Sequence, residues 1–370
     1  MNPVKIKKYL LVLLILNSVV AVSCQDQNKQ QMNEKFQWKE TISCPSGYPV
    51  DVFRGGLESN DGRFTSLFSG IHTGKYGWGS EGRSMSNGLK PLPERLHVIW
   101  ISYAEKTFYE VDTAIDREKI YRLFSRGYYT PSMNKQRPEP FKREYDLINV
   151  GFAPGGVVVI WVGGVGRQIE IGRYQANKTT IPQEVIDKLK EEPVYSMLRP
   201  EYQESVMKNP GIVPPEVQQA HQGKPIPFGL WDSYRKPYPW KVNFTFPNQD
   251  ILTNRITLFL YNGEMEILFG DNQIDQFRIP QELKWNTPTS RPVPKQITFS
   301  WIDKNKVLKS GAVTFEEEEI FQAFEELGSQ LSPGEELRLT IRISQDQTDA
   351  SVWLEANGKK IGLFRSEIDI

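Results

Sequence analysis

The chain has 370 residues, of which 45 are basic and 45 are acidic, so its formal net charge is zero. A neutral chain without a concentrated basic face disfavours a nucleic-acid-binding protein, because phosphate backbones are bound by clustered Lys and Arg. Hydrophobic residues make up 39% of the chain and cysteines number only two, so we expect a fold held by its core and not by disulfides.

The N-terminus has the pattern of a secretory signal peptide. Three lysines precede a short apolar run at residues 10–16, and small residues at 21–23 lead into Cys24. This pattern predicts a lipoprotein signal peptide at 1–23, with Cys24 acylated after cleavage. The apolar run is shorter than the ~20 residues that span a bilayer, so a retained transmembrane anchor is the weaker alternative. A cleaved soluble protein is the other alternative.

The polar residues 24–35 are predicted to form a tether between the lipid and the folded body. Removal of the signal peptide leaves 42 basic and 45 acidic residues in the mature chain. If Cys24 carries lipid, Cys44 has no partner for an intrachain disulfide. Cys44 stands where a strand end enters a turn, which favours a packed, inert thiol over a reactive nucleophile.

Residues 144–174 predict three consecutive strands. The turn Ala153-Pro154-Gly155-Gly156 separates the first two strands, since proline and glycine favour the backbone angles of a tight turn. The return strand at 157–162 is almost entirely β-branched, which indicates burial on both faces. Residues 168–171 alternate polar and apolar side chains, as a half-exposed strand does, so we expect Gln168 to face solvent.

A strand, turn, strand and helix pattern occurs twice, at residues 96–124 and 297–324. Each copy carries a tryptophan in its first strand, and each helix has an isoleucine and a phenylalanine one turn apart (Trp100, Ile120 and Phe124; Trp301, Ile320 and Phe324). Residues 335–365 then repeat the pattern of the three-strand segment, so that Trp353 corresponds to Trp161 and Gly362 to Gly172. Sequence identity between the copies is low, and a coincidence of pattern is the alternative to duplication.

These patterns predict an α+β fold of two tandem, duplicated units, each an antiparallel sheet of about five strands with one helix packed on a face. The first unit covers residues 36–192, a proline- and aromatic-rich connector covers 193–240, and the second unit covers 241–370. In the first unit, Gly55-Gly56 is expected to end the opening strand. In the second unit, Asn262-Gly263 predicts an opening hairpin.

Prolines in the connector limit regular structure to short pieces. Its second part is rich in aromatic residues, which are too numerous to lie loose in solvent (Trp231, Tyr234, Tyr238 and Trp240, with Arg235 among them). One interpretation is that these rings pack between the two units. The other is that they form a groove for an aromatic or glycan ligand.

The sequence predicts no metal site, no cofactor and no catalytic residues. The three histidines (His72, His97 and His221) stand in different settings and lack metal-ligand spacing. No Gly-x-Ser-x-Gly pentapeptide is present. Residues 77–82 match the dinucleotide-binding fingerprint, but no apolar strand precedes them and no helix follows, so we discount that match.

Residues 70–93 are predicted to form a long loop that contains His72 and Trp78. Long ordered loops are uncommon unless they bind something, so this loop is a candidate contact surface. The run Glu316-Glu317-Glu318-Glu319 is interpreted as the first turn of a helix, where the helix dipole favours negative charge.

Several of these motifs resemble a family of bacterial lipoproteins grouped as domain of unknown function 2931. The resemblance is carried by Gly47-Tyr48-Pro49-Val50, Arg54-Gly55-Gly56, Gly77-Trp78-Gly79, residues 100–110, residues 149–159 and Glu170-Ile171-Gly172-Arg173. It covers residues 36–176 and extends through residues 227–232. The resemblance implies a lipid-anchored envelope protein, encoded in some relatives near secreted antibacterial toxins. It supplies no catalytic or ligand residues.

We therefore expect a non-enzymatic envelope protein, anchored through Cys24 in the outer membrane and facing the periplasm or the cell surface. Its function would be to bind a protein partner, and an immunity-type role against a secreted toxin is one form of this. The alternative is a lipoprotein that binds a small molecule or glycan through the connector aromatics. An enzyme with a dispersed site is the third and least favoured class.

Overall fold

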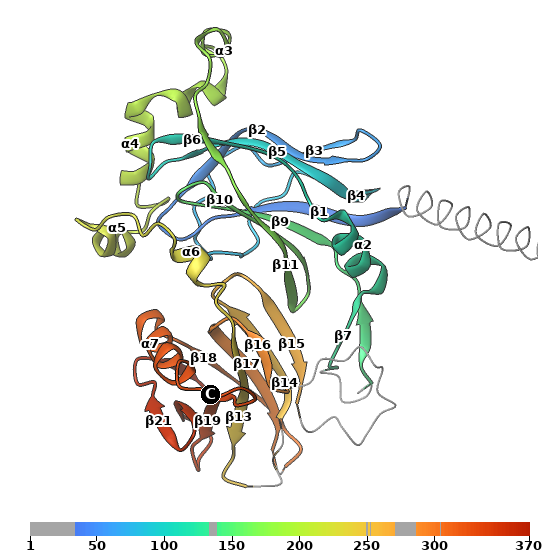
Figure 1. The fold of residues 1–370 in the computed structure, drawn as a ribbon, viewed down its shortest axis with the longest axis vertical. Helices are drawn as coiled ribbons and strands as arrows, with labels where there is room; N and C mark the ends of the chain where they lie inside the picture. The colour runs from blue at the N-terminus through green and yellow to red at the C-terminus, as the bar shows by residue number, and fades with distance from the viewer. Residues whose placement is uncertain (1–33, 133–138, 249–250, 252, 271–285, 304) are drawn as a thin grey trace, which may run out of the picture.

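The fold is described from a computed structural model (Figure 1). The described residues are 34–132, 139–248, 251, 253–270, 286–303 and 305–370. The predicted signal peptide, Cys24 and all but the end of the tether lie outside them. The described part is mostly β-structure with a few short helices, in agreement with the coarse α+β prediction. No helix within it is long and apolar enough to cross a membrane.

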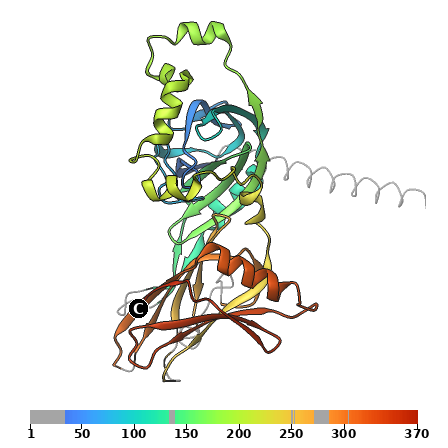
Figure 2. The ribbon, with the colours of Figure 1, turned by 90° about the vertical axis from the view of Figure 1, so that its left-hand side faces the viewer.

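Figures 1 and 2 show two stacked bodies, which we call the first half (strands β1 to β12) and the second half (strands β13 to β22). One sheet of the first half has the strand order β12, β6, β5, β2, β3. These strands are β12 (Asn177–Thr179), β6 (Thr107–Ala114), β5 (Pro93–Ser102), β2 (Val50–Ser59) and β3 (Phe64–Ser66). Helix α2 (Arg117–Arg126) follows β6 and buries Ile120 and Phe124, as the spacing of these residues predicts.

A ten-stranded sheet runs through both halves. The first half contributes β4 (Asn87–Pro91), β1 (Lys35–Ser43), β9 (Leu147–Ala153), β10 (Val157–Gly164) and β11 (Arg167–Gln175), in that order. The second half continues it with β15 (Met265–Phe269), β14 (Thr253–Leu260), β17 (Pro294–Ile302), β18 (Leu308–Thr314) and β22 (Glu367–Asp369). The two parts join at β11 and β15 through one residue pair, Gln168 and Met265.

The third sheet belongs to the second half and has the order β16, β13, β19, β20, β21. Its strands are β16 (Thr289–Arg291), β13 (Tyr238–Thr245), β19 (Leu337–Ile343), β20 (Ala350–Ala356) and β21 (Lys359–Gly362). Helix α7 (Glu317–Gly328) follows β18 and buries Ile320, Ala323, Phe324 and Leu327. A small pair, β7 (Tyr128–Thr130) with β8 (Phe141–Arg143), extends from the first half.

Five short helical pieces lie between β12 and β13, the last four of them in the connector, consistent with its prolines. They are α3 (Gln183–Lys188), η1 (Pro193–Leu198), α4 (Pro200–Lys208), α5 (Pro215–His221) and α6 (Leu230–Ser233). Helices η1, α4 and α5 each begin with a proline, whose missing N–H is not needed in the first turn. Strand β13 begins at Tyr238, so Tyr238 and Trp240 belong to a sheet of the second half and not to a loop.

The three-strand segment and the second hairpin form as predicted. Strands β9, β10 and β11 make an antiparallel meander, and every residue of β9 is buried. Gly155 and Gly156 in the turn have positive φ angles of 81° and 74°, which glycine tolerates without strain. The Asn262-Gly263 turn joins β14 to β15, with Gly263 at φ 88°.

The prediction of one antiparallel sheet in each unit is wrong. Each half places five strands in each of two layers, and each contains a parallel pair, β1 with β9 and β13 with β19. Strand β2 does not end at Gly55-Gly56 but continues through a bulge between Val52 and Arg54. A Cβ on Gly56 would lie 2.1 Å from the Thr65 carbonyl oxygen, so glycine is needed there for β3 to approach.

Cys44 is buried in the core of the first half, and its thiol donates to the carbonyl oxygen of His72 at 3.2 Å. Burial raises the pKa of the Cys44 thiol to about 12. Such a thiol remains protonated and unreactive at neutral pH, in agreement with the prediction of a packed cysteine.

Candidate functional site: a cavity between the two halves

The Gly77-Trp78-Gly79 turn brings the first half against the second. Gly77 and Gly79 have positive φ angles of 86° and 81°, so the chain turns sharply on both sides of Trp78. The Trp78 ring packs edge-on against Trp161 of β10, with 5.0 Å between ring centroids. A Cβ on Gly151 would lie 2.5 Å from the Trp161 ring and 2.8 Å from the Trp78 ring, so glycine in β9 makes room for both.

The main chain of this turn meets the hairpin between β14 and β15. A Cβ on Gly79 would lie only 2.4 Å from the Cα of Gly263, so the two backbones are in direct contact. The buried Gln168 amide joins them, since its Nε2 donates to Gly79 O at 2.7 Å and to Gly263 O at 2.5 Å. Asn149 Nδ2 also donates to Gly79 O, at 2.7 Å. The expectation that Gln168 faces solvent is therefore wrong, because the second half covers it.

Farther along the loop, the buried carboxylate of Glu40 holds the chain in place. Glu40 accepts hydrogen bonds from the backbone amides of Met85 and Ser86 at 2.6 and 2.9 Å, and its other oxygen pairs with Lys90 at 3.2 Å. Burial acts to raise the pKa of Glu40, but hydrogen bonds from the Ser86 hydroxyl and from backbone amides outweigh it and leave that pKa lowered. Residues 70–93 are therefore an anchored segment that includes strand β4, not one long loop.

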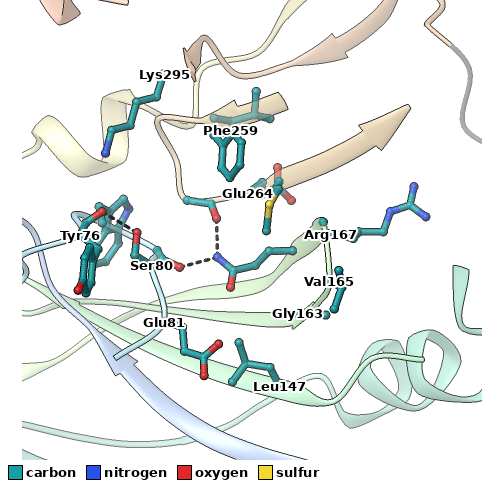
Figure 3. Close-up of a pocket in the computed structure, with 18 of the residues that line it drawn as sticks. Tyr76, Ser80, Glu81, Leu147, Gly163, Val165, Arg167, Phe259, Glu264 and Lys295 are labelled. Carbon is teal, nitrogen blue, oxygen red and sulfur yellow. Dashed lines mark hydrogen bonds between the residues drawn. The ribbon is translucent and has the colours of Figure 1, made fainter. Parts of the chain in front are cut away.

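A cavity of about 660 Å³ opens beside this contact, and we call it the inter-half cavity (Figure 3). Both halves line it, through Tyr76, Trp78 and Glu81, through residues 163–168, and through Phe259, Glu264 and Met265, with Lys295, Gln296 and Thr314 farther along. At its rim, Tyr76 is 70% exposed and Val165 is 61% exposed. The site thus combines apolar and aromatic walls with a small number of polar groups, which is typical of binding cavities.

Most charged groups of the inter-half cavity have partners. Lys39 forms an ion pair with Glu81, and the Arg167 guanidinium lies over the Tyr128 ring at 5.4 Å. Glu264 accepts hydrogen bonds from the Glu170 amide and from Asn262, while burial raises its pKa. Lys295 differs from these groups, since its side chain has no ion pair, hydrogen bond or cation–π contact with any described residue.

The residues that line the inter-half cavity include no pair of a nucleophile and a base. It includes no histidine and no cysteine, and the Ser80 hydroxyl donates to the Tyr76 carbonyl instead of to a base. Nucleophilic catalysis requires a nucleophile hydrogen-bonded to a base, and these lining residues do not provide one. Across the described chain, no group of three or more His, Cys, Asp or Glu side chains is placed to hold a metal.

Of the candidate binding residues, Trp78 lines the inter-half cavity. His72 lies elsewhere, buried and paired through its backbone with Val50. Its Nε2 is 3.2 Å from the Phe68 carbonyl oxygen, and burial lowers its pKa. His72 therefore supports the loop and does not present its ring at the inter-half cavity.

The aromatic residues predicted for the connector are buried, in agreement with the packing interpretation. Trp231 packs edge-on against Tyr48, Tyr234 stacks on Phe321, and both Tyr238 and Trp240 pack edge-on against Phe324. Arg235 forms a two-pronged ion pair with Glu170 of β11, at 2.6 and 3.1 Å. These side chains tie α6 and β13 to their neighbours.

A second cavity, of about 950 Å³, lies beside the connector, and we call it the connector cavity. Tyr234 lines it, together with Tyr48, His221, Ile226 and Phe321. Trp231, Tyr238 and Trp240 are not among its lining residues. Of the four aromatic residues that the sequence suggested for a groove, only Tyr234 therefore lines this cavity.

Sequence reasoning missed the residues that build the inter-half cavity. Gln168, Asn149 and Lys295 are polar residues in strands, and nothing local distinguishes them from exposed polar positions. Gly151 carried a signal, since a glycine inside an apolar strand often marks a close approach of another group.

Comparison with known proteins gives one match. The model of a family described as "Protein of unknown function (DUF2931)" matches residues 23–229, more than half of the chain. No curated protein and no solved structure shows significant similarity. The match spans the first half and most of the connector and ends before β13.

Proposed function

Since the chain belongs to the DUF2931 family, whose function is unknown, we propose from its site that it is a non-enzymatic envelope lipoprotein that binds a protein partner. The partner would contact the rim of the inter-half cavity. Protection against a secreted antibacterial toxin is one form that this function could take.

The observation that carries the proposal is the exposed apolar rim at a cavity built by both halves. Tyr76 and Val165 are large apolar side chains with most of their surface in solvent, and they lie beside the half-buried Trp78. Exposed apolar groups around a concave site are typical of protein interfaces, where aromatic anchors contribute most of the affinity.

Photo-crosslinking tests this proposal. We would replace Tyr76 with a benzophenone amino acid in the full chain, expressed in its native cells so that partners in the cell envelope are present. Phe364 is the matched control, since it is 90% exposed but does not line the cavity. We expect one crosslinked protein from position 76 and none from position 364. Crosslinks of equal yield at both positions, or none at position 76, would reject the rim as an interface.

Membrane attachment is proposed on the pattern that ends at Cys24. Strand β1 begins at Lys35, so a tether of about ten residues would separate the lipid from the folded body. Cys24→Ser should move the protein from the membrane fraction to the soluble fraction and abolish labelling with radioactive palmitate. Retention of the variant in the membrane would refute lipidation as the anchor.

We also propose that the two halves arose by duplication of one unit. The sheet order β12, β6, β5, β2, β3 has its counterpart in β22, β18, β17, β14, β15. The order β11, β10, β9, β1, β4 likewise has its counterpart in β21, β20, β19, β13, β16. Helices α2 and α7 occupy the same place in the chain order, and their N-caps Asp116 and Glu316 each accept from the amide three residues on.

Side chains in β1 and β13 give further support. Phe36-Gln37-Trp38-Lys39 corresponds to Tyr238-Pro239-Trp240-Lys241. The indole N–H of each tryptophan donates to a backbone carbonyl of the adjacent strand region, and a cation lies over each ring. If each half is such a unit, a proteolytic cut at residues 222–229 should leave two fragments that each unfold cooperatively. If only one of the two fragments stays folded, the proposal is contradicted.

The second candidate function is the binding of a small molecule or glycan in the connector cavity. The observation in its favour is the apolar lining that Tyr234, Phe321 and Ile226 provide. Phe321→Ala should weaken the binding of envelope glycans, followed by tryptophan fluorescence, while Phe364→Ala should not. An unchanged fluorescence signal in the wild-type protein would dismiss this candidate.

A further inference from the structure

The side chain of Lys295 enters the inter-half cavity from β17. Figure 3 shows its ammonium group directed toward the segment that carries Tyr76. A Cβ on Gly77 would lie 2.9 Å from the Lys295 Nζ, so the ammonium rests against the Gly77-Trp78 turn. A charge from the second half thus lies against the first half, within the cavity.

This ammonium has no counter-ion in the described part of the chain. No carboxylate lies within 4.0 Å of it, and burial lowers the pKa of Lys295 while the more distant Glu317 acts in the opposite direction. Glu317 accepts a hydrogen bond of 2.5 Å from the Tyr234 hydroxyl. A half-buried charge without a partner is costly, and an anion in the cavity would remove that cost.

The neighbouring groups define which anion fits. Gln296 Nε2 donates to Thr314 Oγ1 at 2.9 Å, which leaves the Thr314 hydroxyl proton able to donate to a ligand. The lining residues of β17 and β18 thus offer one ammonium and one hydroxyl, which suit a singly charged carboxylate. Phosphate groups are usually held by several backbone amides or by arginines. Three carboxylates (Glu81, Asp146 and Glu264) and three cations (Lys39, Arg167 and Lys295) line the cavity, so the lining has no net positive charge that would favour a doubly charged ligand.

The apolar part of the lining defines the rest of the ligand. Trp78 and Phe259 present aromatic rings, and Met265 presents a thioether that packs well against aromatic groups. A carboxylate that reaches Lys295 would therefore carry an apolar or aromatic stem along these walls.

We propose that the inter-half cavity binds a carboxylate on an aromatic or apolar stem, with Lys295 as its ion-pair partner. The carboxylate belongs either to a free small molecule or to the C-terminus of a polypeptide. Only the second source rests on the proposed partner-binding function.

Calorimetric titration of the full mature chain with 3-phenylpropanoate and with its neutral amide tests the site. We expect the amide to bind at least tenfold more weakly than the acid. Lys295→Met should weaken binding of the acid at least tenfold, whereas Lys295→Arg keeps the charge and should stay within a fewfold of wild type. Lys178→Met is the matched control, because Lys178 is exposed on β12 and lies outside the cavity lining.

Thermal melting of Lys295→Met should show a folded protein, since a half-buried methionine costs less than an unpaired ammonium. Equal affinities for acid and amide, an unaffected Lys295→Met variant, or no binding of the acid would each overturn the proposal.

A second pair of probes distinguishes the source of the carboxylate. Acetyl-Gly-Gly-Phe with a free C-terminus is compared with the same peptide as its C-terminal amide. Tenfold tighter binding of the free peptide than of 3-phenylpropanoate identifies a polypeptide C-terminus, and equal affinity identifies a small molecule. If the acid binds but no protein is crosslinked at position 76, the proposed partner-binding function is rejected. The carboxylate site is then retained.

Discussion

Replacement of Gln168 by leucine tests whether one buried amide holds the two halves together. The Gln168 amide is the only described donor to the Gly263 carbonyl oxygen, and both residues are buried. Gly79 O would keep the hydrogen bond from Asn149. Leucine has nearly the same volume as glutamine, so the substitution removes the hydrogen bonds without leaving a large cavity.

The expected loss follows from these contacts. Two hydrogen bonds contribute about 1 kcal/mol each, and a buried carbonyl without a donor costs about 1–3 kcal/mol. Burial of the leucine side chain recovers roughly 1 kcal/mol. Gln168→Leu should therefore lower the free energy of unfolding by about 2–4 kcal/mol.

Urea unfolding, followed by tryptophan fluorescence and by circular dichroism, measures this loss. The matched control is Gln175→Leu, in the same strand, because Gln175 also donates to backbone carbonyls but is exposed. Water replaces those hydrogen bonds, so the control should lose at most about 0.5 kcal/mol. The reasoning is refuted if the two variants lose equal amounts, or if Gln168→Leu unfolds at the wild-type urea concentration.

Three further predictions concern buried groups of the first half. Burial raises the pKa of Asp51 to about 6, above its ordinary value of 3.8, so the folded state binds the proton more tightly than the unfolded chain does. This stabilisation is complete below about pH 4 and is lost as the pH rises through 6. Asp51→Asn should remove on the order of 2–3 kcal/mol of this pH dependence, and urea unfolding between pH 4 and 7.5 measures the change. Glu40→Ala leaves two backbone amides without an acceptor and the Lys90 ammonium without its counter-ion, which should cost about 3–5 kcal/mol and open residues 70–86 to limited proteolysis. Protease resistance equal to wild type would contradict this prediction. Gly151→Ala places a Cβ 2.5 Å from the Trp161 ring, so it should cost about 1–3 kcal/mol and change the near-ultraviolet circular dichroism, and an unaltered spectrum would argue against this contact.

The sequence correctly predicted the turns and helices that are determined by residues close together in the chain. The Pro154-Gly155-Gly156 turn, the Asn262-Gly263 turn and the helices with buried Ile120 and Ile320 all form where their patterns place them. In each case the residues that decide the structure lie within a few positions of one another. Turn chemistry and amphipathic spacing are therefore readable without knowledge of the rest of the fold.

Pairings over long sequence distances were not predictable in this way. Strand β1 pairs in parallel with β9, more than one hundred residues later, and nothing near Lys39 or Leu147 marks that partner. Gly55-Gly56 was interpreted as the end of a strand because glycine often ends one. In the fold Gly55 admits the close approach of β5 and Gly56 that of β3.

Gln168 shows the same limit at the site. Alternation within one strand indicates which side chains face the core of that strand's own sheet, and it correctly places Gln168 on the polar face of the strand. Alternation cannot indicate that the second half of the molecule covers this polar face. Only the position of the second half makes Gln168 a buried residue and, with Lys295, part of a cavity.

The way in which the halves meet explains why the cavity lies between them. The ten-stranded sheet crosses from β11 to β15 through a single residue pair, so backbone pairing alone contributes little to their association. Contacts with Gly263 of the second half contribute instead, from the Trp161 ring, the Gly79 backbone and the Gln168 amide. The inter-half cavity lies at this short join, since both paired residues, Gln168 and Met265, line it together with Lys295. A ligand bound there would contact both halves at once, so its binding would stabilise their association by mass action.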